Sequence, residues 1–268
     1  MATTDSETLK AAVRETYGRI ASGRTPAGCC SGSGCCAPAP GSTSDGIGYS
    51  DEECQSVPEG ADLGLGCGNP QALADLRAGE RVLDLGSGAG FDAFLAARQV
   101  GPTGFVIGVD MTAEMVARGR ANLLKTDSKN VEFRLGEIEH LPVADASVEV
   151  IMSNCVINLS TDKPAAFREA FRVLAPGGRL AIADIVALSE IPIAIRNDLE
   201  AYAGCVAGAG LVPDLVRMLT EAGFKDVVVD VRESRERVQN AEQDLWAGDF
   251  IASALIRATK PSAEQSRG

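Results

Sequence analysis

Cysteine is the residue type whose number stands out for chemistry, because the chain has eight cysteines and a single histidine, His140. Thiolates bind soft metal and metalloid ions and take part in redox reactions, whereas an inert thiol packs as a small apolar side chain. The first residues, MATTDSETLK, contain no apolar signal segment, so we expect a cytoplasmic protein, in which permanent disulfides are rare. The single histidine disfavours a His-based zinc enzyme and a Ser-His-Asp hydrolase.

A glycine-rich segment, DLGSGAG over residues 84–90, is the second feature that predicts chemistry. Its glycines, Gly86, Gly88 and Gly90, let the backbone approach a ligand closely. Their GxGxG spacing differs from the GxGxxG that seats a pyrophosphate, so a ligand without phosphates fits better. Asp110 follows the next apolar run, where a carboxylate can accept hydrogen bonds from both ribose hydroxyls. These features favour S-adenosylmethionine over NAD as the cofactor.

The elements that position these residues alternate between strand and helix patterns. We expect an amphipathic helix over 7–22 and a flexible, cysteine-rich loop over 23–50, and Pro70 after the capping Asn69 predicts a helix start. Strands are predicted at 81–86, 104–110, 131–136, 148–154, 179–186, 224–231 and 250–259, and helices at 90–100, 113–125, 163–174 and 213–222, with a turn at 176–178. The pattern predicts an α/β fold with a doubly wound, seven-stranded, mostly parallel, Rossmann-like sheet.

The same pattern suggests how the chain is organised. We divide it into an N-terminal helix and flexible cysteine-rich segment (1–68), a cofactor-binding core (69–186), a substrate-binding insertion that carries Cys205 (187–212), the remainder of the core (213–259) and a polar tail (260–268). With 45% hydrophobic residues the chain can bury a substantial core. Its formal charge of −12 argues against nucleic acid and anionic membranes as partners.

On these residues, the segment from about 69 to 259 resembles the class I S-adenosylmethionine-dependent methyltransferases. The resemblance implies that Asp84 and the 86–90 loop, with Ser87, hold the amino-acid part of the cofactor and that Asp110 binds its ribose. It further implies that Met111 flanks the adenine, and that the segment with Glu137 and Ile138 contacts the adenine edge. Asn154, at the end of the fourth strand, completes the cofactor residues that we expect.

Three cysteine contexts resemble the arsenite S-adenosylmethionine methyltransferases in particular. They are LGLGCGNP around Cys67, SNCVINLS around Cys155 and AYAGCVAGAG around Cys205. The resemblance implies that these three thiolates bind trivalent arsenic and that Cys54 is a redox partner, for which Cys54 with Cys67 is the candidate disulfide pair. A pyramidal three-thiolate site would leave the arsenic lone pair open for methyl transfer. The expected substrates are arsenite, its thiol conjugates and trivalent methylarsenicals, and the expected reductant is thioredoxin or glutathione.

Two alternatives stay open from the residues alone. The chain could methylate a small organic nucleophile, in which case its cysteines would have no role in the reaction. It could also be a thiol-rich protein that binds metalloids without catalysis. The pairs Cys29, Cys30 and Cys35, Cys36 lack CxxC spacing, so they predict arsenic capture or incidental exposure about equally well. Longer members of the family carry an additional C-terminal domain, and we expect its function to be missing or supplied otherwise.

Overall fold

The computed structural model describes residues 5–24, 48–232 and 250–262. Its strands are β1 (Arg81–Leu85), β2 (Phe105–Asp110), β3 (Val131–Leu135), β4 (Val148–Asn154), β5 (Leu174–Ala187), β6 (Lys225–Arg232) and β7 (Ile251–Thr259). Its helices are α1 (Ser6–Ala21), α2 (Asp51–Ser56), α3 (Pro70–Ala74), α4 (Phe91–Val100), α5 (Ala113–Leu123), α6 (Lys163–Val173), α7 (Ile193–Arg196), α8 (Leu199–Ala203) and α9 (Val212–Ala222), with a 3-10 turn, η2, at Ile157–Leu159. The predicted cysteine pairs at 29–30 and 35–36 lie outside the described residues.

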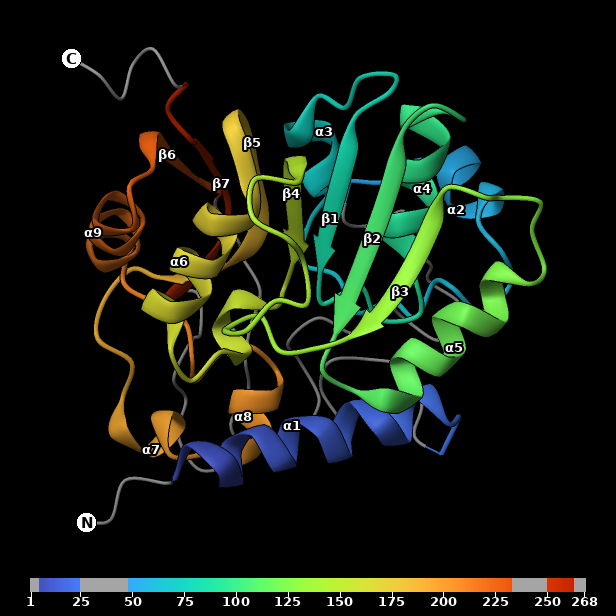
Figure 1. Cartoon of the computed structure of the whole chain (residues 1–268). Coiled ribbons are helices and arrows are strands. Elements are labelled where there is room, and N and C mark those ends of the chain that lie inside the picture. Colours follow the sequence, from blue (N-terminus) through green and yellow to red (C-terminus); the bar gives the residue numbers. More distant parts are fainter. Residues whose placement is uncertain (1–4, 25–47, 233–249, 263–268) are drawn as a thin grey trace.

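The strands form one sheet in the order β3-β2-β1-β4-β5-β7-β6 (Figure 1). The first five strands in this order pair in parallel, and β7 runs antiparallel to both β5 and β6. The strand order reverses between β1 and β4, and a doubly wound sheet binds its ligand at such a point, beyond the carboxyl ends of the strands. The predicted seven-stranded, mostly parallel fold is therefore confirmed.

Alternating strand residues build a separate core on each face of the sheet. On one face, residues such as Leu83 and Ile107 pack against Phe167 of α6 and Leu215 of α9. On the other face, the cluster that contains Val82 and Val106 packs against α3, α4 and α5. Because successive strand residues point to opposite faces, these continuous apolar runs are typical of a sheet covered on both sides.

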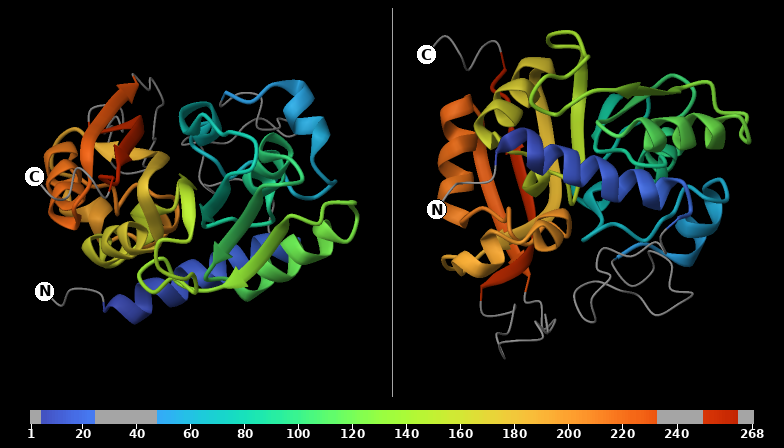
Figure 2. Two further views of the ribbon diagram at one scale, coloured as in Figure 1. Left: turned by 45° about the horizontal axis from the view of Figure 1, so that its top comes forward. Right: turned by 90° about the horizontal axis from the view of Figure 1, so that it is seen from below.

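A third apolar cluster lies at the carboxyl edge of the sheet, where β4 and β5 end. There Val13 of α1 packs with Cys155, Leu159, Tyr202 and Cys205. Figure 1 shows α1 running along this edge past α5 and α8, and Figure 2 shows the same helix crossing it from below. Helix α1 was predicted at almost these boundaries, but its position over the sheet edge was not.

One predicted boundary differs from the structure. The turn predicted at 176–178 falls within β5 (Leu174–Ala187), between Leu174 and Arg179, the residues at which its pairing with β4 jumps. Its pairing with β4 shifts register between Val148 and Val150, and Gly177 has a positive φ of 81°. The glycines that the sequence pattern assigned to a turn therefore lie in an irregular part of this strand.

Candidate active site

An open cavity lies under α1 at the carboxyl edge of the sheet. It is lined by the loops that follow β1, β2, β3 and β4 and by three residues of α1, namely Lys10, Val13 and Tyr17. Among the predicted cofactor residues, those that line it are Asp84, Gly86, Ser87, Gly88, Asp110, Met111, Ile138 and Asn154. The topology thus brings together side chains from four separate strand ends.

Two glycines of the loop between β1 and α4, Gly86 and Gly90, are packed too tightly for a side chain. Gly86 has a φ of +67°, and a Cβ there would lie 2.1 Å from Cγ2 of Val156. Gly90, the first residue before α4, has a φ of +99°, and its Cβ would lie 2.6 Å from the Phe133 ring. Gly90 does not itself line the cavity, so packing accounts for this glycine, whereas Gly86 and Gly88 border the open space.

Three carboxylates, those of the buried Asp84 and Asp92 and the half-buried Asp110, surround one end of the cavity. Burial raises the pKa of Asp84 well above its ordinary value, and the nearby Asp92 and Asp110 raise it further. Within the described part of the chain, Oδ2 of Asp84 has no hydrogen-bond partner, and none of the three carboxylates forms an ion pair. Buried like charges without a cation destabilise one another, so this arrangement favours a positively charged ligand.

Asp110 is held in place by the backbone at the end of β2. It accepts hydrogen bonds from the amide of Gly88 at 3.0 Å and from the amide of Thr112 at 2.8 Å. The carboxylate is therefore fixed between the glycine loop and the start of α5. A ribose could be bound here by the acceptor positions that these two amides leave open.

Glu137, a second predicted cofactor residue that is absent from the cavity lining, is bound by α1. Its carboxylate accepts a hydrogen bond from Nζ of Lys10 at 2.6 Å and pairs with Arg14, both of which belong to α1. The hydrogen bond with Lys10 lowers the pKa of Glu137. Glu137 does not line the cavity, whereas its neighbours Gly136, Ile138 and Glu139 do. Its contacts therefore assign it to holding α1 over the site rather than to facing the cavity.

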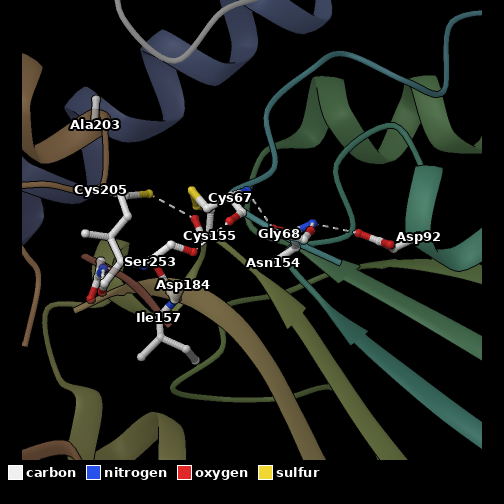
Figure 3. Close-up of a disulfide and its surroundings, with 12 residues drawn as sticks. Cys67, Gly68, Asp92, Asn154, Cys155, Ile157, Asp184, Ala203, Cys205 and Ser253 are labelled. Atoms are coloured by element: carbon white, nitrogen blue, oxygen red, sulfur yellow. Dashed lines mark hydrogen bonds between the residues drawn. A yellow bond between two sulfur atoms is a disulfide. The ribbon is translucent and has the colours of Figure 1, made fainter. Parts of the chain in front are cut away.

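Cys67, Cys155 and Cys205 lie close together (Figure 3), and of the three only Cys155 lines the cavity. Cys67 and Cys155 form a disulfide with a Cα–Cα distance of 5.6 Å, and Sγ of Cys205 donates a hydrogen bond to the Cys155 carbonyl at 3.0 Å. Both Cys155 and Cys205 have positive φ angles, of 55° and 65°. Such backbone conformations are unusual outside glycine and concentrate at functional sites.

In the structure Cys67 is paired with Cys155, whereas the sequence analysis expected Cys54 as its redox partner. Cys67 is bonded to Cys155, and one sulfur forms only one disulfide. Cys54 lies half-buried on α2, a short helix that sits beside α4 in Figure 1. Eighty-eight residues separate the two bonded cysteines, so their pairing depends on the β1–β4 topology rather than on local sequence.

Asn154 connects the thiol end of the cavity to its acidic end. Its Oδ1 accepts a hydrogen bond from the Cys67 amide at 2.9 Å, and its Nδ2 donates to the Gly68 carbonyl at 2.8 Å. The same Nδ2 lies 3.2 Å from Asp92 and 3.1 Å from the hydroxyl of Tyr49, which donates to Asp92 at 2.6 Å. The loop that carries Cys67 is thus fixed by the residue at the end of β4.

Asp184 is a site residue that the sequence reasoning missed. It belongs to β5, is 2% exposed, and places a carboxylate oxygen within 4.8 Å of the sulfurs of Cys155 and Cys205. Burial raises its pKa to about 6, against the lowering effect of its backbone donors and of Lys163. In the sequence it is visible only as a charge that interrupts an apolar run, and Asp92 and Tyr49 have no local signal either.

Comparisons with known proteins agree with this geometry. The family model described as a methyltransferase domain matches residues 76–223. An arsenite methyltransferase of Halobacterium salinarum is 50% identical over 97% of this chain and 68% of its own length, and that of Homo sapiens is 35% identical over 68% of this chain and 51% of its own. The chain therefore spans about half to two thirds of the length of these curated relatives.

Among solved structures, an arsenic(III) S-adenosylmethionine methyltransferase from Chlamydomonas reinhardtii is similar with a TM-score of 0.63 and 34% identity. The similarity covers 74% of this chain and 68% of that one. No helix in residues 5–24, 48–232 and 250–262 is long and apolar enough to cross a membrane. Fold, domain match and relatives agree that the chain belongs to the arsenite methyltransferase family.

Proposed function

We propose that this chain is an S-adenosylmethionine-dependent arsenite methyltransferase. The observation that carries the proposal is the position of Cys155, which lines the same cavity as Asp84 and Asp110 and has Cys67 and Cys205 beside it. A thiol-bound substrate would thus share one cavity with the residues that fit the cofactor. Proximity of this kind converts a bimolecular transfer into one within a single complex.

The acidic end of the cavity has the chemistry to hold the cofactor. The unpartnered Oδ2 of Asp84 suits the ammonium group of the cofactor, and Asp110 suits its ribose hydroxyls. Gly86 and Gly88 have no side chains, so the part of the cofactor between these two groups can lie close to the backbone there. When bound, S-adenosylmethionine supplies a methyl group on a positively charged sulfur. The carboxylates of this chain bind and orient that cation, because their own mutual repulsion is relieved by it.

The thiols hold the substrate. We assign Cys155 and Cys205 as thiolate ligands of trivalent arsenic, with Cys67 as the third. Each thiol that replaces a hydroxyl of arsenite gives up its proton, which leaves with the hydroxyl as water. Three soft sulfurs on one side leave the arsenic lone pair on the other side, where it forms the bond to the methyl carbon while the carbon–sulfonium bond breaks.

The disulfide between Cys67 and Cys155 then suggests how the product is released. Methylation raises arsenic to the pentavalent state, and two thiolates that join as a disulfide return two electrons to it. Cys67 and Cys155 are within bonding reach, so we assign them as this redox pair in place of Cys54 with Cys67. A thiol reductant such as thioredoxin or glutathione would reopen the disulfide for the next cycle, and trivalent methylarsenicals would enter as further substrates.

Product analysis of purified variants tests the assignment. We expect Cys155→Ser and Cys205→Ser to lose methylarsenic formation from arsenite, because each removes a thiolate ligand, while S-adenosylmethionine binding by calorimetry stays unchanged. Cys54→Ser serves as the matched control and is expected to keep activity. Methylarsenicals formed at the wild-type rate by both Cys155→Ser and Cys205→Ser would refute the thiolate assignment.

A further inference from the structure

The carboxylate of Asp184 is a buried charge beside the thiols that the proposed mechanism does not use. Figure 3 shows it next to Cys155, Cys205 and Ile157. Oδ2 accepts a hydrogen bond from the Ile157 amide at 2.9 Å, and Oδ1 accepts from Nδ2 of Asn158 at 2.9 Å and from the Ile185 amide at 2.8 Å. Three donors therefore hold one carboxylate in a single orientation.

These hydrogen bonds fix the turn that carries Cys155. The turn begins at the left-handed Cys155, whose amide donates to the Ala183 carbonyl at 2.9 Å, and it continues into η2. A non-glycine residue in this conformation persists only when its surroundings hold it there. Asp184 supplies that restraint, because it binds the amide two residues after Cys155 from the neighbouring strand β5.

The turn that Asp184 holds also contacts the segment that carries Cys205. Nδ2 of Asn158 also donates to the Ile185 carbonyl at 2.6 Å. The backbone carbonyl oxygen of Asn158 packs against Gly208, where an added Cβ would lie 2.0 Å from it. The hydroxyl of Tyr202 donates to the Leu159 carbonyl at 3.1 Å. The two cysteine-bearing segments thus pack against each other at Asn158, which Asp184 binds, and at Leu159, the next residue of the same turn.

A cationic side chain, that of Lys163, faces Asp184. Lys163, at the start of α6, interacts electrostatically with Asp184, Cys205 and Glu139, and burial lowers the pKa of Lys163 against these attractions. A carboxylate with hydrogen-bond donors and a nearby cation can remain charged in a buried place. Its position is therefore set by the fold and is not adjusted by solvent.

We propose that Asp184 is a positioning residue that sets the separation of the Cys155 and Cys205 sulfurs, so that one trivalent arsenical is bound by both. The inference rests on the proposed function, because it deepens the assignment of these two thiolates. Two thiols at a fixed separation bind such a ligand far more tightly than two that move independently, since the second bond forms within one complex.

The test uses the full chain with its other six cysteines changed to serine, so that only Cys155 and Cys205 remain. Phenylarsine oxide, which bridges two thiols, is titrated against the reduced protein in competition with a small dithiol. We expect Asp184→Asn to weaken phenylarsine binding at least about tenfold, because an amide nitrogen would face the donors of Asn158 and Ile185. Both thiols should still react with a monofunctional alkylating reagent, and S-adenosylmethionine affinity should stay within about twofold of the parent.

Two further variants complete the design. Ile182→Val, a core truncation on the same strand, controls for a general loss of stability and is expected to keep phenylarsine affinity. Asn158→Ser removes the amide that bridges Asp184 to Ile185 and should weaken binding in the same direction, which gives a result even where Asp184→Asn does not fold.

The proposal is overturned by phenylarsine affinity within about twofold of the parent in folded Asp184→Asn, or by an equal loss in Ile182→Val. Tight phenylarsine binding by the parent together with no arsenite methylation by the wild-type chain would instead refute the proposed function. The two failures are distinguishable because phenylarsine binding needs no methyl transfer.

Discussion

Replacing Asn154 with alanine should free the Cys67 loop and shift the equilibrium of the Cys67–Cys155 disulfide. The change removes the acceptor of the Cys67 amide at 2.9 Å and the donor to the Gly68 carbonyl at 2.8 Å. At about 1 kcal/mol for each hydrogen bond, the loop loses about 2 kcal/mol of anchoring. That loss corresponds to a roughly thirtyfold lower effective concentration of Cys67 against Cys155.

The assay equilibrates the protein in glutathione redox buffers, traps free thiols by alkylation and measures the disulfide by mass spectrometry. The control is Tyr49→Phe, which removes the hydroxyl that contacts Asn154 and Asp92 but keeps both hydrogen bonds to the Cys67 loop. Its disulfide equilibrium should stay within about twofold of wild type. An unchanged equilibrium in Asn154→Ala, or an equal shift in Tyr49→Phe, would refute the argument that Asn154 positions Cys67.

Three further predictions concern the cofactor end of the cavity. Asp84→Asn should raise the melting temperature of the unliganded protein at pH 7 and weaken S-adenosylmethionine binding about ten- to a hundredfold in calorimetry, because the amide is uncharged. Because the pKa of Asp84 is raised in the folded state, the free energy of unfolding of the wild type should fall as the pH increases above the ordinary value of 3.8 and through the raised pKa. Urea unfolding of Asp84→Asn should show a smaller fall over the same pH range. Gly86→Ala should lose about 2 to 4 kcal/mol in urea unfolding, because its Cβ would lie 2.1 Å from Val156, and an unchanged midpoint would contradict the packing argument. Glu137→Gln should lower the free energy of unfolding by about 1 kcal/mol, because it weakens the ion pairs with α1. A large loss of cofactor affinity with unchanged stability would instead indicate that Glu137 contacts the adenine, as the sequence analysis expected.

The fold was predictable because its signals are local. The apolar runs of β1 and β2 and the glycines between β1 and α4 are contiguous in sequence, and the parallel arrangement follows from their alternation with helices. The positions of Asp84 and Asp110 at strand ends followed directly from these boundaries. Their shared position at one cavity is a consequence of the topology.

The remainder of the site depends on contacts between distant segments. Glu137 is bound by Lys10 and Arg14 of α1, which lie more than a hundred residues earlier in the chain. The pairing of Cys67 with Cys155 depends on the loop held by Asn154, and no sequence pattern encodes it. Such choices among equally plausible partners are made by tertiary packing and by the need to satisfy buried polar groups.

The most direct test of the proposed function follows the methyl group itself. The reduced protein is incubated with arsenite, S-adenosylmethionine labelled in its methyl group, and thioredoxin or glutathione, and the products are separated by chromatography with elemental arsenic detection. We predict that the label co-elutes with arsenic, and that it fails to do so in Cys155→Ser. Transfer of the label to an organic acceptor, or no labelled arsenic from the wild-type protein, would contradict the proposed function.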